Sequence, residues 1–175
     1  MRRSSAATAA FAAALLAAGI GVRADDDDAI KALRKRHLAV PVQGVDRDDL
    51  RDTFSDTRDA TRKHEALDIL APRDTPVLAV EDGTVAKLFL SKPGGITIYH
   101  YDPSRTYAYY YAHLARYVEG LKAGDTLHRG DVIGYVGTTG NAPPGTPHLH
   151  FAIFKLADPK RWWDGVAIDP YPVLK

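Results

Sequence analysis

The sequence predicts an all-β domain of mostly antiparallel strands, arranged as a compact sandwich or open barrel, with a short helix near its N-terminus. From residue 76 onward, short runs of Val, Ile, Leu and Tyr alternate with Gly, Pro and Asp, which is the pattern of strands joined by tight turns. Few segments between these runs show the 3.6-residue period of a helix. About 150 residues remain beyond an N-terminal leader, a length that suits one domain.

The first 24 residues have the composition of an export signal. Two arginines open the segment, an Ala/Leu-rich run continues to about Val22, and the small residue Ala24 precedes four aspartates. We therefore expect a signal peptide over residues 1–24, a mature chain beginning at Asp25, and a periplasmic or extracellular location. The alternative is a retained membrane anchor, but the apolar run is short for a membrane span.

Charge and cysteine content narrow the range of partners. The formal charge is +1, and loss of the leader would remove three arginines and no acid, which leaves −2. Such a chain has no basic footprint for nucleic acid, so we expect no nucleic-acid partner and no stable membrane anchor after signal cleavage. The sequence has no cysteine, which excludes disulfides and a lipidated N-terminal cysteine. We expect a monomer.

The segment after the leader divides into an arm and a domain. Residues 25–37 place acids at the beginning and basic residues at the end of a short predicted helix, which suits the helix dipole. We interpret residues 25–45 as an exposed N-terminal arm and residues 46–175 as the functional domain, which begins with a charge-dense loop.

Strand signals continue along the domain. Residues 77–80 and 84–90 predict a hairpin closed by the Asp-Gly turn at 82–83. Residues 95–100 and 105–113 predict a second antiparallel pair across an Asp-Pro-Ser turn.

The segment His148-Leu149-His150 is the strongest candidate for a site. In a strand, alternation places both histidines on one face, about 7 Å apart, and turns Leu149 and Phe151 toward a core. This spacing allows one imidazole to bind a metal ion while the other reaches the water on that ion. The alternative is a pair of structural histidines.

Further ligands lie upstream, in the pentad that begins at His64 and ends at Asp68. A hydrolytic zinc ion is held by three protein ligands in a tetrahedron whose fourth position stays open for water. His64, Asp68 and His150 supply two imidazoles and a carboxylate. A straight strand would separate His64 from Asp68 by about 13 Å, so we place His64 on a loop and Asp68 at the start of a strand. A solvated loop is the alternative for the pentad.

Three other histidines need an assignment. In the predicted strand at 105–113, alternation places His113 on the same face as Tyr107, Tyr109 and Tyr111, where a packed aromatic surface is as good an interpretation as a catalytic one. His100 and His128 are expected to be packing or surface residues.

Four motifs in order carry a resemblance to a known family. His-x-x-x-Asp, Tyr-Ala-His-Leu, Gly-Asp-x-Ile-Gly and His-Leu-His-Phe span about residues 54–170 and resemble the lysostaphin-type (LytM-type) zinc endopeptidases, which cut peptidoglycan peptides. The resemblance implies a fold of the duplicated-hybrid-motif type, with a substrate groove floored by the strands that bear His113 and His148. It implies that His64, Asp68 and His150 bind Zn²⁺ and that His113 and His148 are catalytic.

One position departs from the family pattern. The pentad usually has glycine at its centre, where this chain has Ala66. Alanine would strain the loop if the position needs a positive φ, and would be tolerated if the position only needs close packing.

The implied function is that of an exported zinc-dependent endopeptidase, which hydrolyses peptide bonds in peptidoglycan stem peptides or cross-bridges through a zinc-activated water. We expect His148 to take the proton from that water, and His113 to stabilise the oxyanion or share the proton transfer. Tyr107, Tyr109 and Trp162 are expected to line the groove. The alternatives are a non-catalytic module that binds peptidoglycan or activates a hydrolase, and a sugar-transport phosphocarrier-like domain.

Overall fold

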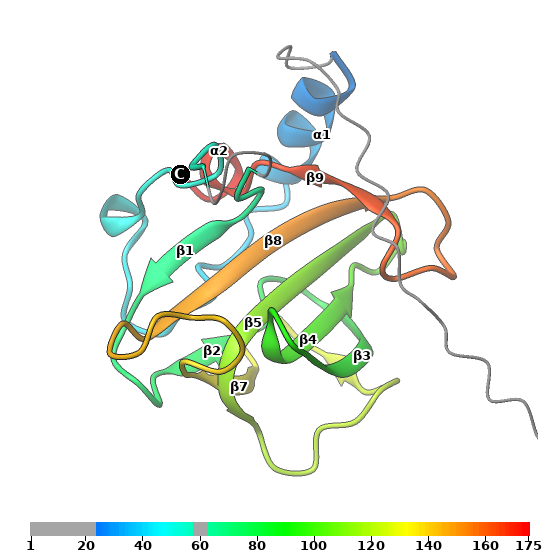
Figure 1. Cartoon of the computed structure of the whole chain (residues 1–175). Coiled ribbons are helices and arrows are strands. Elements are labelled where there is room, and N and C mark those ends of the chain that lie inside the picture. The colour runs from blue at the N-terminus through cyan, green and yellow to red at the C-terminus, as the bar shows by residue number, and fades with distance from the viewer. Residues whose placement is uncertain (1–23, 58–62) are drawn as a thin grey trace, which may run out of the picture.

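In the computed structural model, which describes residues 24–57 and 63–175, the chain forms one open antiparallel sheet with short helices beside it (Figure 1). The all-β prediction is confirmed, and the sheet is open and not closed into a barrel. The strands are β1 (Leu67–Leu70), β2 (Pro76–Leu78), β3 (Gly83–Ser91), β4 (Gly95–Tyr101), β5 (Tyr107–Tyr117), β6 (Thr126–Leu127), β7 (Val132–Val136), β8 (His148–Leu156) and β9 (Gly165–Ile168). The predicted signal peptide, residues 1–24, lies outside the described residues except for Ala24.

Two long strands in the middle of the sheet carry most of the candidate site. The main strand order is β1-β8-β5-β4-β3-β6, with β9 paired to β8, and β7 paired to both β5 and β2. The predicted pairing of residues 95–100 with 105–113 is confirmed as the β4–β5 pair. Strand β8 lies between β1 and β5 over part of its length (Figure 1). Side chains from three paired strands can therefore share one face of the sheet near the beginning of β8.

The predicted hairpin of residues 77–80 with 84–90 is wrong. Strand β2 pairs with β7, and β3 pairs with β4 and β6. Gly83 explains the false signal, because a Cβ atom there would lie 2.0 Å from the carbonyl oxygen of Tyr101. Glycine at this position therefore permits close approach to the end of β4, and it does not close a turn back onto β2.

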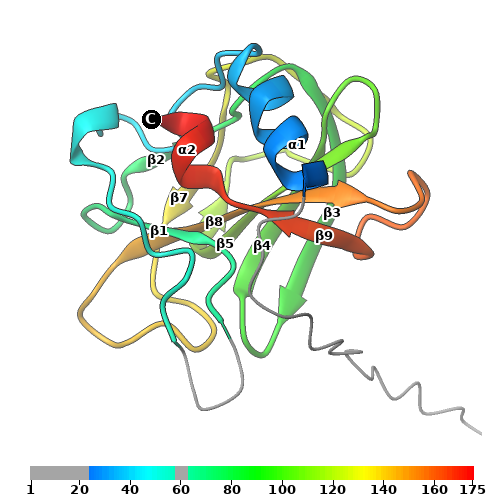
Figure 2. The ribbon, with the colours of Figure 1, turned by 90° about the horizontal axis from the view of Figure 1, so that it is seen from above.

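The N-terminal segment is packed against the domain, so its interpretation as an exposed arm is also wrong. Helix α1 (Ala24–Arg34) lies beside α2 (Pro170–Leu174), as Figure 2 shows. Ala29 and Leu33, four residues apart on one helical face, are buried in the core. Just after the helix, Arg36 forms ion pairs of 3.0 Å with both Glu81 and Asp102.

The core follows the predicted alternation of β8. Leu149, Phe151 and Ile153 are fully buried on one face, and Phe151 contacts the rings of Tyr109 and Tyr111 from β5. The expectation that Tyr107 and Tyr109 line a groove is therefore wrong, because both belong to this core.

Among the helices of the described residues, none is long and apolar enough to cross a membrane.

Candidate metal centre

A short upstream segment forms hydrogen bonds with the loop that carries His64. The backbone N–H of His64 donates to the carbonyl of Asp56 at 2.9 Å, and that of Glu65 donates to Phe54 at 3.0 Å. Thr53 contributes twice, because its carbonyl accepts from His64 Nδ1 at 2.9 Å and its hydroxyl accepts from the N–H of Asp68 at 3.0 Å. His64 thus lies on a loop and Asp68 in β1, as predicted.

The replacement of glycine by Ala66 does not strain this loop through a positive φ. The residue with a positive φ is its neighbour Glu65, at 54°. Ala66 is fully buried. Of the two possibilities that the sequence left open, close packing is therefore the one that applies at this position.

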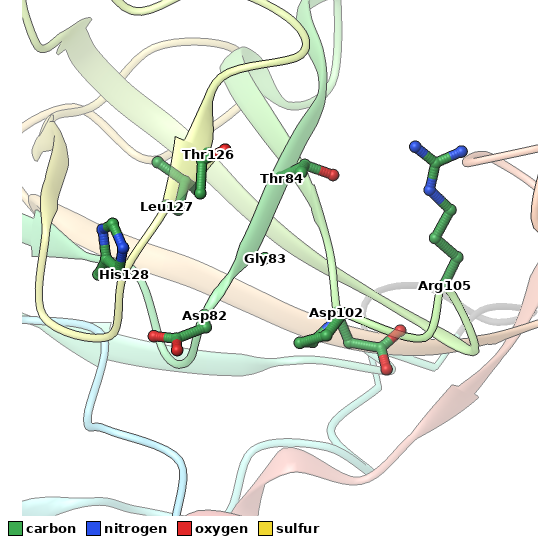
Figure 3. A pocket seen from close by; sticks show the side chains of 9 residues that line it. Asp82, Gly83, Thr84, Asp102, Arg105, Thr126, Leu127 and His128 are labelled. Carbon is green, nitrogen blue, oxygen red and sulfur yellow. The ribbon is translucent and has the colours of Figure 1, made fainter.

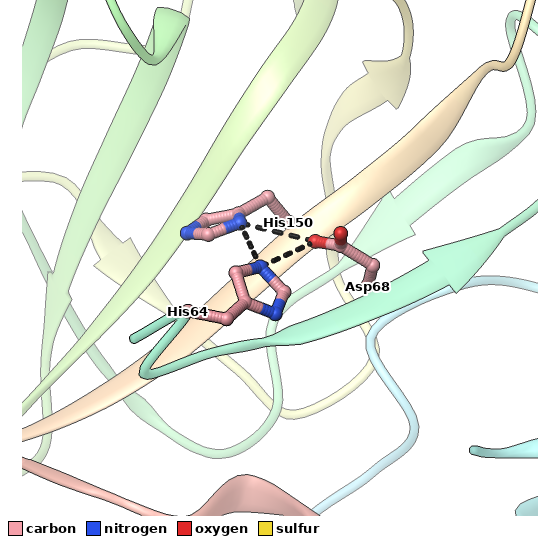
Figure 4. Close-up of side chains that lie close together, drawn as sticks. All are labelled: His64, Asp68 and His150. Atoms are coloured by element: carbon pink, nitrogen blue, oxygen red, sulfur yellow. Dashed lines mark hydrogen bonds and ion pairs between the residues drawn. The ribbon is translucent and has the colours of Figure 1, made fainter. Parts of the chain in front are cut away.

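His64, Asp68 and His150 meet in space although 86 residues separate the first from the last. Asp68 and His150 are direct partners in the β1–β8 pair. Asp68 Oδ1 lies 3.0 Å from His64 Nε2 and 3.0 Å from His150 Nδ1, and these two nitrogens are 2.9 Å apart (Figure 4). Within the described part of the chain, these three residues form the one group of His, Cys, Asp or Glu that is placed to hold a metal ion.

The chemistry of this donor set fits a zinc ion. His64 Nδ1 donates its proton to a carbonyl, so loss of the proton on Nε2 would present a lone pair to a metal ion at the other two atoms. Ligand atoms of a tetrahedral zinc at bond lengths of about 2.0–2.1 Å lie about 3.4 Å apart, which is a few tenths of an ångström wider than the observed triangle. Burial alone would raise the pKa of Asp68, but hydrogen bonds from His150 and His64 outweigh it and hold that pKa well below its usual range.

His148 lies beside this triangle on the same face of β8, as alternation predicts. Its Nε2 atom is 3.9 Å from Asp68 Oδ1, and its Nδ1 donates to the carbonyl of Thr146 at 2.9 Å. The proton on Nδ1 leaves Nε2 as a proton acceptor on the side of Asp68.

His113 also faces the triangle, but not for the reason the sequence suggested. Between the pairs Ile98–Tyr111 and Ile96–Leu114, strand β5 advances three residues while β4 advances two. This extra residue is a β-bulge, and His113 has a φ of 60°. The bulge reverses the alternation, so the prediction that His113 shares a face with the three tyrosines is wrong.

The bulge places His113 among the other histidines. Its ring centroid lies 5.0 Å from that of His148 and 5.5 Å from that of His150. Its Nδ1 donates to the carbonyl of Thr139 at 2.8 Å. Burial lowers the pKa of His113 to about 4, which favours the neutral ring.

Sequence reasoning missed the groups that orient these rings. His64, His113 and His148 each donate Nδ1–H to a backbone carbonyl, those of Thr53, Thr139 and Thr146. Because carbonyls are present at every residue, side-chain identity gives no signal for them. The glycine pair at residues 94–95 was the available hint for the bulge, since the N–H of His113 donates to the Gly94 carbonyl at 2.8 Å.

Comparison with known proteins decides the family. Residues 62–170 match Peptidase family M23. The chain belongs to peptidase family M23. This match covers all five candidate site residues, and it gives no support to the phosphocarrier alternative.

Two relatives and one solved structure illustrate what the M23 chain resembles. It is 37% identical over 132 residues to an L-Ala–D-Glu endopeptidase of Bacillus subtilis, covering 71% of this chain and 39% of the relative. It is 36% identical over 90 residues to the peptidoglycan DD-endopeptidase ShyC of Vibrio cholerae, covering 51% and 20%. The crystal structure of a putative glycyl-glycine endopeptidase lytM from Ruminococcus gnavus matches with a TM-score of 0.60 and 32% identity, over 71% of this chain and 52% of that one.

The family match, the identities and the structural similarity confirm the resemblance to lysostaphin-type and LytM-type peptidases. The M23 chain spans about two fifths or less of the length of these two relatives.

A separate cavity lies away from the candidate metal centre of this M23 domain. It has a volume of about 430 Å³ and lies near the start of β3, between the turn before β5 and strand β6 (Figure 3). Its lining includes Asp82, Asp102, Arg105 and His128, but none of the five candidate site residues. Asp82 accepts from the N–H of Arg129, and Asp102 accepts from Arg36, so both carboxylates already have partners.

Proposed function

We propose that this protein is an exported, zinc-dependent endopeptidase that hydrolyses peptide bonds in peptidoglycan. One observation carries the proposal above the others. Three candidate ligand atoms lie within 3.0 Å of one another beside two further histidines, on the sheet face of a domain that belongs to an M23 peptidase family. A non-catalytic binding module would not need this complete set of side chains.

Each residue has a proposed role. His64 Nε2, Asp68 Oδ1 and His150 Nδ1 would hold a zinc ion, with His64 oriented by Thr53. A zinc ion with an open position supplies a water of lowered pKa, about 7 instead of about 15.7, and polarises the scissile carbonyl. His148, whose proton resides on Nδ1, accepts the proton of the attacking water on Nε2 and passes it to the leaving amine.

His113 is proposed as the second catalytic histidine. Its Nδ1 is held by Thr139, so its Nε2 is also the atom available for proton transfer. Burial keeps this ring neutral at the outset, so Nε2 must first accept a proton during the reaction, and Nε2–H then donates a hydrogen bond to the developing oxyanion. The bulge in β5 makes this role possible, because a regular strand would turn the ring into the core.

The substrate and the location are proposed from the relatives. The relatives above include enzymes named for L-Ala–D-Glu and for peptidoglycan DD bonds, and peptidoglycan lies outside the cytoplasm. We infer that residues 1–24 act as the export signal and that the mature chain works as a monomer on wall peptides.

The experiment is digestion of purified peptidoglycan with the mature protein, with and without a chelator. We expect new amino termini and no new reducing sugar, because the proposed chemistry cleaves amides and leaves glycosidic bonds intact. The chelator should abolish the release of amines, and added zinc should restore it. Reducing ends without amines would contradict the proposal, as would amine release that the chelator does not affect.

A further inference from the structure

A row of aromatic side chains continues outward from the candidate metal centre across the sheet. We call it the aromatic strip and define it as Tyr110, Tyr99, Phe89, Trp162 and Trp163. None of these residues has a role in the proposed reaction, although the sequence analysis expects Trp162 to line the groove. Three of them belong to different neighbouring strands.

Ring contacts connect the strip to the site without a gap. The ring of Tyr110 meets His150 edge-on, with centroids 6.0 Å apart. Tyr110 and Tyr99 are direct partners in the β4–β5 pair, with ring centroids 4.6 Å apart. The strip therefore begins at a candidate zinc ligand and lies on the same face of the sheet.

The far end of the strip is open to solvent. Trp162 lies in the connection between β8 and β9. Its ring centroid is 4.5 Å from that of Tyr99 and 5.6 Å from that of Phe89. Trp163 lies 5.1 Å from Trp162 and is 53% exposed, and Phe89 is 37% exposed. The guanidinium of Arg161 lies 6.0 Å from the Trp163 ring and adds a hydrogen-bond donor at this end.

The size of the strip suits a part of the substrate beyond the cut bond. Three strand intervals separate β8 from β3, which corresponds to about 14–15 Å. An extended peptide of about four residues covers this distance. A group attached within about four residues of the scissile bond therefore reaches the exposed rings.

The side chains that flank the cut bond in the relatives would give these rings little to contact. Relatives are named for bonds between L-Ala and D-Glu and between glycines, whose side chains are a methyl group, a carboxylate or hydrogen. The amino-sugar rings to which wall peptides are attached have flat faces of C–H groups and polar edges. Tyr and Trp match both, because each combines a flat apolar face with a polar N–H or O–H.

We propose that the aromatic strip binds a sugar ring of the glycan strand, so that the site takes glycan-linked peptide in preference to free peptide. This inference rests on the proposed peptidase function for its meaning, but its test does not depend on cleavage. The probe is the peptide-free tetramer of N-acetylglucosamine. The protein contains two tryptophans, both in the strip, so intrinsic tryptophan fluorescence reports on this surface alone.

We expect a saturable fluorescence change with the tetramer, and a Kd that Trp163→Ala weakens about 2- to 12-fold, the range for one aromatic contact. Trp162 remains as the reporter in this variant. The matched control is Tyr135→Ala, which removes a ring on β7 outside the strip and should leave the Kd unchanged. Phe89→Leu, which keeps an apolar side chain but removes the ring, is the second variant should Trp163→Ala fail to fold.

Three results would overturn the inference: no saturable change, equal affinity in the wild type and both strip variants, or a wild-type dimer that Trp163→Ala dissociates. The last would assign the strip to a second copy of the chain. Failure of the peptidase proposal and failure of this inference are distinguishable. A protein that binds the tetramer but releases no amines from peptidoglycan refutes the peptidase proposal. A protein that releases amines without binding the tetramer refutes only the role of the aromatic strip.

Discussion

At the scale of single residues, the distance between a ring nitrogen and Asp68 Oδ1 separates the candidate ligands from the candidate catalyst His148. His64 and His150 direct a nitrogen to within 3.0 Å of Asp68 Oδ1. His148 is 3.9 Å from the same oxygen and is held by a carbonyl, as is His113. A ligand and a catalyst should therefore respond differently to the same substitution.

Alanine at His113 or His148 should leave zinc bound and lower kcat on peptidoglycan by roughly 10²–10⁴-fold, since each removes one proton-transfer group or oxyanion donor. Metal content and amine release, measured on the same preparation, check this expectation. His128→Ala, which changes a solvent-exposed histidine outside the site, is the matched control. Parallel loss of zinc and activity in His148→Ala would mean that the ligand and the catalyst of the His-x-His pair are interchanged.

At the scale of elements, one irregularity in β5 places His113 on the sheet face that carries the candidate metal centre. Without the bulge, His113 would follow Tyr109 and Tyr111 into the core. The bulge costs a positive φ of 60° at a residue that carries a Cβ atom. Such strain is typical of positions where function requires one side-chain direction.

The bulge predicts that glycine at position 113 gives a more stable protein than alanine, which is the reverse of the usual order within a strand. His113→Gly should unfold with a free energy about 1 kcal/mol higher than His113→Ala, because only glycine adopts this φ without strain. One residue earlier, Ala112 has no positive φ and is fully buried. Ala112→Gly should therefore lose about 0.5–1 kcal/mol or more. Urea unfolding of the variants measures both differences, and an alanine at position 113 as stable as glycine would refute the account of the bulge.

These elements also show how far the sequence could lead. The alternation of β8, the loop at His64 and the pairing of β4 with β5 follow from local patterns, and the structure has all three. The partner of β2 is β7, more than 50 residues away, and no local pattern encodes a distant partner. The bulge at His113 and the docking of α1 through Leu33 and Arg36 likewise depend on contacts made only in the folded chain.

At the scale of the whole molecule, a histidine outside the candidate site lies in the core. His100 in β4 is fully buried, and its Nδ1 is 3.2 Å from the hydroxyl of Tyr111. Burial lowers the pKa of His100 to about 4, although the backbone of Asp82 and the carboxylates of Asp102 and Asp82 oppose the shift. The folded protein thus holds this ring neutral at a pH where the unfolded chain protonates it.

The sign of the resulting pH dependence is fixed. The folded pKa lies below the unfolded value of about 6.5, so between pH 6.5 and 4 the unfolded state binds more protons and stability falls as the pH falls. Between pH 7 and 5, His100 should cost on the order of 2 kcal/mol. Urea unfolding gives the free energy of unfolding at pH 7 and at pH 5. The difference between these two values should be smaller by about 2 kcal/mol in His100→Gln than in the wild type, and it should be unchanged in His128→Gln. An equal pH dependence in all three proteins would contradict the assignment.

The metal content of the purified mature protein tests the central claim most directly. With His64, Asp68 and His150 as the ligands, the wild type should carry one zinc per chain, and Asp68→Ala should lose most of it, because a two-ligand site binds zinc far more weakly. His128→Ala should keep full occupancy and so exclude a general effect of substitution. Full zinc occupancy in Asp68→Ala, or a wild-type protein that remains free of zinc when zinc is supplied, would contradict the account.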